Sequence, residues 1–188
     1  LYFSPLTLHP CPFTVFMSVL PVRLFPDSLL KLPCHAVERA TPAIHRLIQD
    51  LVTTMRHHPR CVGLAAPQVG ARWAVAVLET RRHPKGSPEG GLTVLLNPRI
   101  VEGEGAVLQR EGCLSVPDLT GNVRRAGRVR VQARDANGQP WSKWFEGFEA
   151  IAVQHEVDHL QGRLFLDRVS NAKTDVFQRK TYGERLPP

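Results

Sequence analysis

Apolar positions recur along the chain at spacings that predict both helices and strands. Thr41 followed by Pro42 is a typical helix start, because threonine caps the first turn and proline fits its geometry. Apolar residues then recur every three or four positions, as on one face of a helix, at Ile44, Leu47, Ile48, Leu51, Val52 and Met55. This pattern predicts a helix over about residues 42–57.

Several later segments have the patterns of strands. Apolar runs at 73–79 and 92–96 predict buried strands, and the polar, Gly/Pro-rich segment 81–91 between them predicts a loop. Strict alternation over 128–134 predicts a half-exposed strand whose apolar face carries Val129, Val131 and Ala133. The turn residues at 135–138 then lead into another strand, at Trp141 to Phe145.

The last third of the chain contains a second helical pattern. One face of this helix carries Phe148, Ile151, Ala152, His155, His159 and Leu160, so this face is expected to look inward. Ser170 is a candidate cap for a short final helix that ends near Arg179. Helices and strands in this order are typical of an α+β domain.

Length and charge limit the possible classes of protein. The chain has 188 residues, enough for one domain with a substantial core, and no apolar run long enough to span a membrane. Its net charge is +7, and basic residues gather at Arg81, Arg82, Lys85, Arg124, Arg125, Arg128, Arg130, Arg134, Lys173, Arg179, Lys180 and Arg185. A basic surface could hold the protein near ribosomal RNA, although solvated charged faces explain most such runs.

The segment His155-Glu156-Val157-Asp158-His159 carries the most specific chemistry. Residues four apart lie on one face of a helix, so the two histidines can bind one metal ion. Glu156 lies one residue further round, close enough to act on a water molecule at the ion without being a ligand. The alternative is a solvated helix with two incidental histidines, which the core-facing stripe disfavours.

A catalytic metal site of this type needs a third protein ligand. In some metalloproteases the motif is extended to H-E-x-x-H-x-x-G-x-x-H, and its last histidine is the third ligand. This chain matches the extended motif up to Gly162, but the last position is Phe165, which cannot bind a metal. Other metalloproteases take the third ligand from a glutamate in a following helix, and Glu184, almost at the C-terminus, is the only candidate for that role. Cys113, entered through a glycine in the segment 111–117, is the best upstream candidate, and unpaired thiols without a role are the better interpretation of Cys11, Cys34 and Cys61. A cysteine that must be a thiolate to bind metal fits a reducing compartment.

With these residues in view, the chain resembles the bacterial-type peptide deformylases. Three separated segments carry the resemblance, Gly63 to Gly70, Glu111 to Pro117 and Gln154 to Gly162. Weaker similarity runs from about Met17 towards the C-terminus, so we expect a catalytic domain over 17–188 and an extra N-terminal segment over 1–16. The resemblance implies a single α+β domain in which antiparallel sheets pack around a central metal-binding HExxH helix.

The resemblance also implies an activity. Enzymes of this family hydrolyse the N-formyl group of the N-terminal formyl-methionine of newly synthesised polypeptides and release formate, in the bacterial cytoplasm or in an organelle. Glu156 matches the general base and acid of the family, whereas Gln68 and the backbone N–H of Leu114 match the donors to the oxyanion. The metal ligands match Cys113, His155 and His159. The family points to Fe²⁺ as the native divalent ion, and the ligand set alone also admits Zn²⁺, Ni²⁺ and Co²⁺.

Residues of the substrate pocket follow from the same comparison. Positions around the methionine side chain in the family align with Val62, Gly63, Phe148, Ile151 and Ala152. Ordinary core packing is the alternative for Phe148 and Ile151. Glu111 is a further pocket residue, expected to hydrogen-bond backbone near the metal loop.

The sequence departs from the family at one position and matches it at a nearby one. Many relatives have an arginine seven residues after the ligand cysteine, where this chain has Thr120. Threonine cannot offer a charged fork to the downstream peptide, so this contact is not predicted. Arg125 matches a basic position that pairs with the acid inside the helix motif, here Asp158, although two solvated charges are the alternative.

Two other classes of function remain open at this stage. An HExxH metalloprotease is the alternative enzyme, and Phe165 and the Cys113 motif weigh against it. A metal-binding module without catalysis is the third hypothesis. Glu156 and Gln68 weigh against that hypothesis, because a structural metal site would need neither residue.

Overall fold

The computed structural model describes residues 18–179 of the chain. The expected segment 1–16, the domain start at Met17 and the tail residues Lys180, Glu184 and Arg185 therefore lie outside the described part. In chain order, the helices and strands are η1 (Ser28–Lys31), α1 (Pro42–His57), β1 (Gly63–Ala65), η2 (Ala66–Val69), β2 (Val75–Leu78), β3 (Thr93–Glu104), β4 (Val107–Cys113), β5 (Val116–Arg125), β6 (Arg128–Arg134), β7 (Pro140–Glu146), α2 (Gly147–Leu160), η3 (Phe165–Arg168), α3 (Ala172–Asp175) and β8 (Val176–Gln178).

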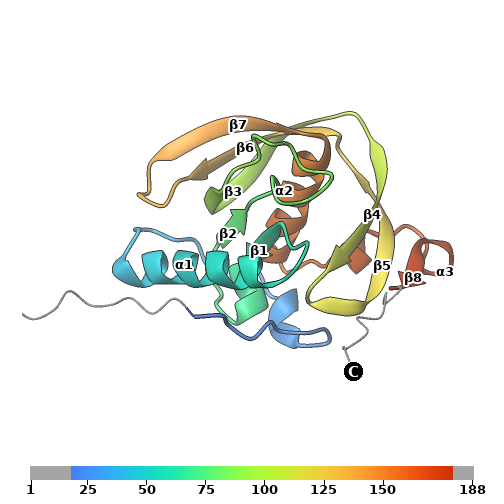
Figure 1. The fold of residues 1–188 in the computed structure, drawn as a ribbon, viewed down its shortest axis with the longest axis horizontal. Helices are drawn as coiled ribbons and strands as arrows, with labels where there is room; N and C mark the ends of the chain where they lie inside the picture. Colours follow the sequence, from blue (N-terminus) through green and yellow to red (C-terminus); the bar gives the residue numbers. More distant parts are fainter. Residues whose placement is uncertain (1–17, 180–188) are drawn as a thin grey trace, which may run out of the picture.

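The strands form two antiparallel sheets, which Figure 1 shows on either side of α2. One sheet has the order β1-β2-β3-β6-β7 and the other has the order β4-β5-β8. A long pair of strands continues from one sheet into the other, because Glu104 pairs with Arg128 at the end of β3 and Val107 pairs with Arg125 at the start of β4. This arrangement confirms the expected α+β class with a central helix.

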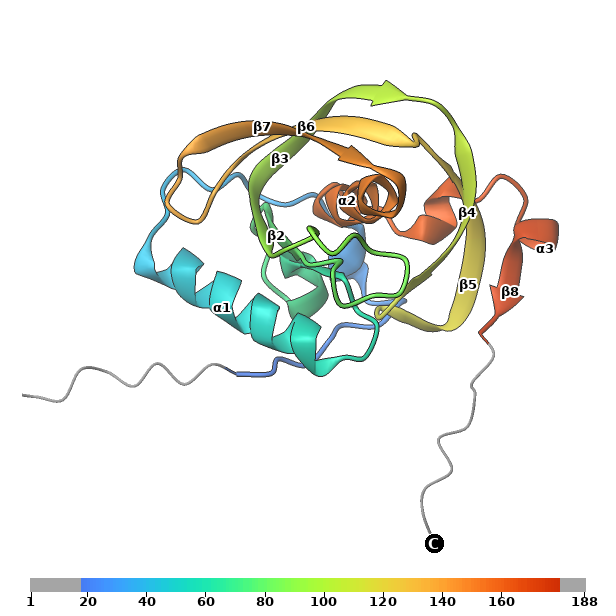
Figure 2. The same ribbon diagram turned by 45° about the horizontal axis from the view of Figure 1, so that its top comes forward.

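The helix α2 is enclosed by the rest of the fold. Figure 2 shows it nearly end-on, with β6 and β7 on one side and β4 and β5 on another. Every residue from Ala150 to Leu160 is buried except His155, which is half-buried. The prediction of one inward face therefore understates the burial, since a helix enclosed on all sides needs apolar or paired residues all round.

The first predicted helix is confirmed from its first residue to its last. Thr41 caps α1 by accepting a hydrogen bond from the backbone N–H of Ile44, and Pro42 occupies the first turn. The buried face of α1 packs on β1 and β2 through Ile44, Ile48, Leu51 and Met55. This packing holds the strand that leads into the 66–70 turn.

Most of the predicted strands are confirmed, but the C-terminal prediction is wrong. The alternating segment 128–134 is β6, and the run at 92–96 is only the start of β3, which continues through exposed polar residues because β6 pairs with it. The expected final helix is limited to α3, capped by Asn171 rather than Ser170. The chain then enters β8, because Val176 and Phe177 pair with Gly121 and Thr120 of β5. None of the helices within residues 18–179 has the length and apolar character needed to cross a membrane.

Candidate active site

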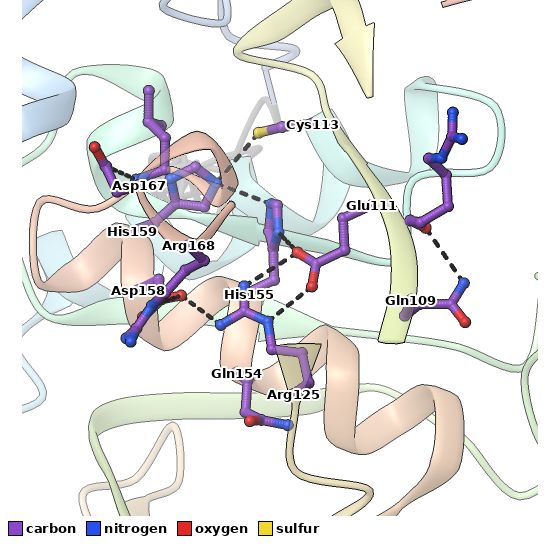
Figure 3. A network of polar contacts seen from close by, with 12 residues as sticks. Gln109, Glu111, Cys113, Arg125, Gln154, His155, Asp158, His159, Asp167 and Arg168 are labelled. Atoms are coloured by element: carbon purple, nitrogen blue, oxygen red, sulfur yellow. Dashed lines mark hydrogen bonds and ion pairs between the residues drawn. The ribbon is translucent and has the colours of Figure 1, made fainter. Parts of the chain in front are cut away.

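Three predicted metal ligands meet at the junction of β4 and α2. Cys113 is the last residue of β4, and His155 and His159 lie one turn apart on α2. The Sγ of Cys113 lies 3.2 Å from Nε2 of His159, which lies 3.2 Å from Nε2 of His155. All three ligand atoms lie within 4.8 Å of one another (Figure 3). The structure thus brings together residues that are more than 40 positions apart in the sequence.

The chemistry of this group fits a divalent transition metal. One thiolate and two imidazoles are an accepted ligand set, and a tetrahedral ion bound at about 2.0–2.3 Å places its ligand atoms roughly 3.3–3.6 Å apart. Burial alone would raise the pKa of Cys113, but the neighbouring His159 and His155 outweigh it and hold this pKa well below the ordinary value. These neighbours therefore favour the thiolate of Cys113, the form that binds metal.

A buried ion-pair network orients the first histidine. The Nδ1–H of His155 donates to Oε2 of Glu111 at 2.8 Å, which turns Nε2 towards Cys113 and His159. Arg125 donates two hydrogen bonds to Glu111, at 2.7 and 3.1 Å, and a third to Asp158, which also accepts from Arg168. Figure 3 shows this network from the sulfur to the guanidinium groups.

The network confirms one prediction and corrects two others. Arg125 does pair with Asp158, and both side chains are buried. Arg125 is consequently not part of the basic surface with which the sequence groups it. Glu111 is expected to bind backbone near the metal loop, but its carboxylate instead accepts from the side chains of Arg125 and His155. Charged partners satisfy a buried carboxylate better than neutral backbone groups do.

Glu156 points into space that a glycine leaves open. A Cβ atom on Gly63 would lie 2.4 Å from Oε1 of Glu156, so only glycine at this position leaves room for the carboxylate. The side chain is 4% exposed, and its Oε2 has no hydrogen-bond partner within residues 18–179. Burial raises the pKa of Glu156 to about 7, so the carboxyl can exchange a proton near neutral pH.

Gln68 is held with its amide N–H groups towards the metal ligands. Its Oε1 accepts from the backbone N–H of Ala65 at 2.9 Å, which fixes which end of the amide faces Cys113. Its Nε2 lies 3.2 Å from Oγ of Ser115 and 3.4 Å from Sγ of Cys113. Leu114 lies beside it, in the tight turn between β4 and β5. A neutral donor is thus fixed beside the ligand group.

All the predicted pocket residues line one cavity of about 450 Å³. Its wall also includes Gln68, Cys113, Leu114, His155 and Glu156. The residues predicted for the methionine pocket all contribute, namely Val62, Gly63, Phe148, Ile151 and Ala152. Phe148 is covered on one side by the ring of His83, whose centroid lies 4.6 Å away. The cavity therefore combines an apolar wall with the polar groups of the ligand site.

The sequence did not predict the basic part of the wall. Arg60, Lys85, Arg110 and Arg179 also line the cavity. Lys85 and Arg179 are in the basic runs that the sequence shows, but only the folding of the 79–91 loop and the β5–β8 pairing bring them here. Cys61 lines the cavity as well, and it remains a free thiol.

The chain is similar to known proteins over most of its length. A model of the polypeptide deformylase family matches residues 19–175. A peptide deformylase from Alkalilimnicola ehrlichii is 39% identical over 164 residues, which cover 87% of this chain and 89% of that protein. One from Heliobacterium modesticaldum is 41% identical and covers 82% of this chain and 97% of that protein.

Solved structures show the same relationship. A class I type b peptide deformylase from Acinetobacter baumannii, bound to Met-Ala-Ser, has a TM-score of 0.77 and 38% identity, covering 82% of this chain and all of that one. A peptide deformylase from Synechococcus elongatus in complex with actinonin has a TM-score of 0.73 and 35% identity, covering 81% of this chain and 79% of that one. Sequence and fold thus both relate the chain to the peptide deformylases.

Proposed function

The chain belongs to the polypeptide deformylase family, and from this premise we propose how its own residues remove the N-formyl group from the N-terminal methionine of a nascent peptide. The observation that supports the proposal is one cavity whose wall contains Cys113 and His155, two members of the ligand group, together with Glu156 and Gln68. A metalloprotease is not favoured by these relatives.

Cys113, His155 and His159 would hold the divalent ion. When bound, the ion supplies Lewis-acid chemistry, because it lowers the pKa of a water molecule from about 15.7 towards 7 and polarises a carbonyl oxygen. Glu156 accepts a proton from the attacking water at its free carboxylate oxygen. As the C–N bond of the formamide breaks, Glu156 returns this proton to the methionine nitrogen, and formate and a free amine result.

Gln68 stabilises the oxygen of the formyl group as negative charge develops on it. The bond from the backbone N–H of Ala65 holds the amide in place, so Nε2 keeps its position beside the ligand group, and an N–H directed to Ser115 or Cys113 turns to the oxyanion. The backbone N–H of Leu114 is the second donor. The methionine side chain of the substrate packs against the apolar wall formed by Val62, Phe148 and Ile151. Burial of a methionine side chain contributes roughly 1.5–3 kcal/mol to binding.

One assay tests this function against its alternatives. Formate release from formyl-Met-Ala-Ser would be compared with cleavage of the same peptide without its formyl group. We expect formate from the first peptide and no cleavage of the second. Cleavage of the unformylated peptide would support a metalloprotease, and metal binding without either product would support a non-catalytic module.

Fe²⁺ is the native ion in this proposal. Zinc prefers a closed tetrahedron, whereas formamide hydrolysis gains from an ion that can accept a further oxygen ligand. Iron beside a thiolate is sensitive to oxygen, which can also oxidise Cys113. The apo-protein would be loaded anaerobically with Fe²⁺, Zn²⁺, Ni²⁺ or Co²⁺, and formate release measured before and after exposure to air. A zinc form that is more active than the iron form without oxygen would contradict this assignment.

The cytoplasm, where formylated chains emerge from bacterial ribosomes, is the compartment that this function requires; an organelle is the alternative. Contact with ribosomal RNA is proposed through exposed basic residues such as Arg124 and Arg134. Other basic residues of this surface already pair with carboxylates, since Arg128 binds Glu104 and Glu146 and Arg130 binds Glu102. Co-sedimentation with ribosomes that persists at low salt and falls steeply with added salt would support the contact.

A further inference from the structure

Arg179 lies at the end of β8, the outer strand of the sheet β4-β5-β8, and its guanidinium group reaches the cavity beside β4. Arg179 follows β8 directly, and its backbone N–H donates to the carbonyl oxygen of Asp118 at 2.7 Å. Its side chain crosses the sheet, and Nη2 donates to the carbonyl oxygen of Cys113 at 3.3 Å. The guanidinium thus lies next to a predicted metal ligand and lines the cavity.

Small residues on β4 and β5 make this approach possible. Gly112 pairs with Thr120, and Thr120 pairs with Phe177 of β8, so the three lie in one row across the sheet. A Cβ atom on Gly112 would lie 2.5 Å from Nη2 of Arg179, so the guanidinium occupies the space that a side chain there would fill. Threonine at 120, with its short side chain, also leaves this face open.

Arg110, which also lines the cavity beside β8, has a structural role. The guanidinium of Arg110 lies 3.5 Å from the centroid of the Phe177 ring and donates to Thr120 and Asn122. Arg110 therefore fastens β8 to the sheet. Arg179, in contrast, uses a single long hydrogen bond from its side chain and has no carboxylate partner in the part of the chain that the structure describes. A guanidinium has five N–H donors, so most of them remain available to a molecule in the cavity.

We propose that Arg179 binds the carbonyl oxygen of the residue that follows the formyl-methionine, and so determines how well this enzyme holds the downstream peptide. The inference rests on the proposed function. Thr120 has no charged fork to offer, and Arg179 supplies one from the end of β8 instead. Hydrogen bonds from a charged donor to a substrate are strong enough to change affinity about 10-fold or more.

The test compares two substrates and four proteins, the unaltered protein and three variants. Formyl-Met-Ala-Ser has the downstream carbonyl group, and formyl-methionine methylamide lacks it. For Arg179→Ala we expect kcat/KM to fall about 10-fold or more with the tripeptide, mainly through KM, and to stay within about twofold with the methylamide. Arg179→Lys should recover part of the loss. Arg130→Ala, which removes an exposed arginine paired with Glu102 outside the cavity, is the control for lost charge.

A binding measurement separates this proposal from the proposed function. Calorimetry with the product peptide Met-Ala-Ser needs no turnover, and Arg179→Ala should weaken its binding by about the same factor. Weakened binding without formate release from the unaltered protein would support Arg179 and contradict the function. Formate release with equal losses on both substrates, or with no loss on either, would overturn the role of Arg179. A loss equal to that of Arg130→Ala would overturn it too.

Discussion

Glu156 has its place because residue 63 has no side chain, since a Cβ atom there would lie 2.4 Å from the carboxylate. The carboxylate is buried beside the ligand group but is not one of the three ligand residues. It can therefore move protons without contributing to metal affinity. A side chain at position 63 would therefore displace this carboxylate, although residue 63 takes no part in the proposed chemistry.

We expect Glu156→Ala to keep its metal and to lose about 10²–10⁴-fold in turnover, the usual contribution of a general acid–base group. Metal content after dialysis would be measured beside formate release. Glu156→Gln is the matched variant, because it has nearly the same shape and cannot take up the proton, and it should lose as much. A fully metallated variant with near-normal turnover would show that the role of Glu156 is assigned wrongly.

Gln68→Ala should lower kcat far more than it raises KM. Its hydrogen bond strengthens mainly as charge develops on the oxyanion, so the expected loss in kcat is on the order of 100-fold or more. Steady-state kinetics of formate release measure both parameters. An effect on KM alone would make Gln68 a residue that binds the substrate in its ground state.

Among the structural elements, α2 ends in a turn that only glycine fits well. Gly162 has φ +71°, its N–H donates to the carbonyl oxygen of His159, and the N–H of Arg163 donates to that of Asp158. This pair of bonds is a Schellman motif, which ends the helix at Leu160, one residue after the second histidine. A Cβ atom on Gly162 would also lie 2.6 Å from the carbonyl oxygen of Lys31.

Gly162→Ala should therefore destabilise the protein by at least about 1–2 kcal/mol, the cost of a left-handed conformation for a residue with a side chain. Gly91→Ala is the matched control, because a Cβ atom there would have its nearest contact at 3.9 Å. Thermal unfolding of both variants measures the difference, which corresponds to a decrease of roughly 2–4 °C for each kcal/mol. Equal stability of the two variants would contradict the argument.

The elements also show why the sequence predicted some parts well and others poorly. The limits of α1 are local signals, since Thr41 and Pro42 start it and a regular stripe follows. The limits of β8 are not local, because Phe177 pairs with Thr120, more than 50 positions away. The two histidines of the ligand group belong to a local sequence motif, whereas the presence of Arg179 in the cavity depends on that distant pairing. Sequence patterns describe single elements well and pairings between distant elements poorly.

For the whole molecule, the ligand group adds a further connection between parts that packing and the buried ion pairs of Glu111 and Arg125 already join. Cys113 belongs to the sheet β4-β5-β8, and His155 and His159 belong to α2, which also packs on the other sheet. An ion held by all three residues binds the folded chain only, because the unfolded chain does not bring them together. Binding to the folded state alone raises stability.

Removing the metal should therefore lower Tm, and adding it back should restore Tm in proportion to the logarithm of its free concentration. At a thousand times Kd the expected stabilisation is about 4.1 kcal/mol. Cys113→Ala is the comparison, because it lacks the ligand that joins β4 to α2, and its Tm should respond far less. Differential scanning calorimetry with and without chelator measures both. An equal response of the two proteins would place the ion elsewhere.

The long separation between the ligands also has a consequence for the order of events during folding. Cys113 and His159 are 46 positions apart, and two of the strands between them also pair outside this stretch of the chain, β6 with β3 and β5 with β8. Chains of this kind fold slowly, because distant segments must meet before their contacts give any stability. A divalent ion has no complete set of ligands until Cys113 and the two histidines have come together in the folded chain. Refolding should consequently proceed at the same rate at any metal concentration, whereas unfolding should slow as the ion is added, so the metal prolongs the life of the native state without helping the chain to reach it.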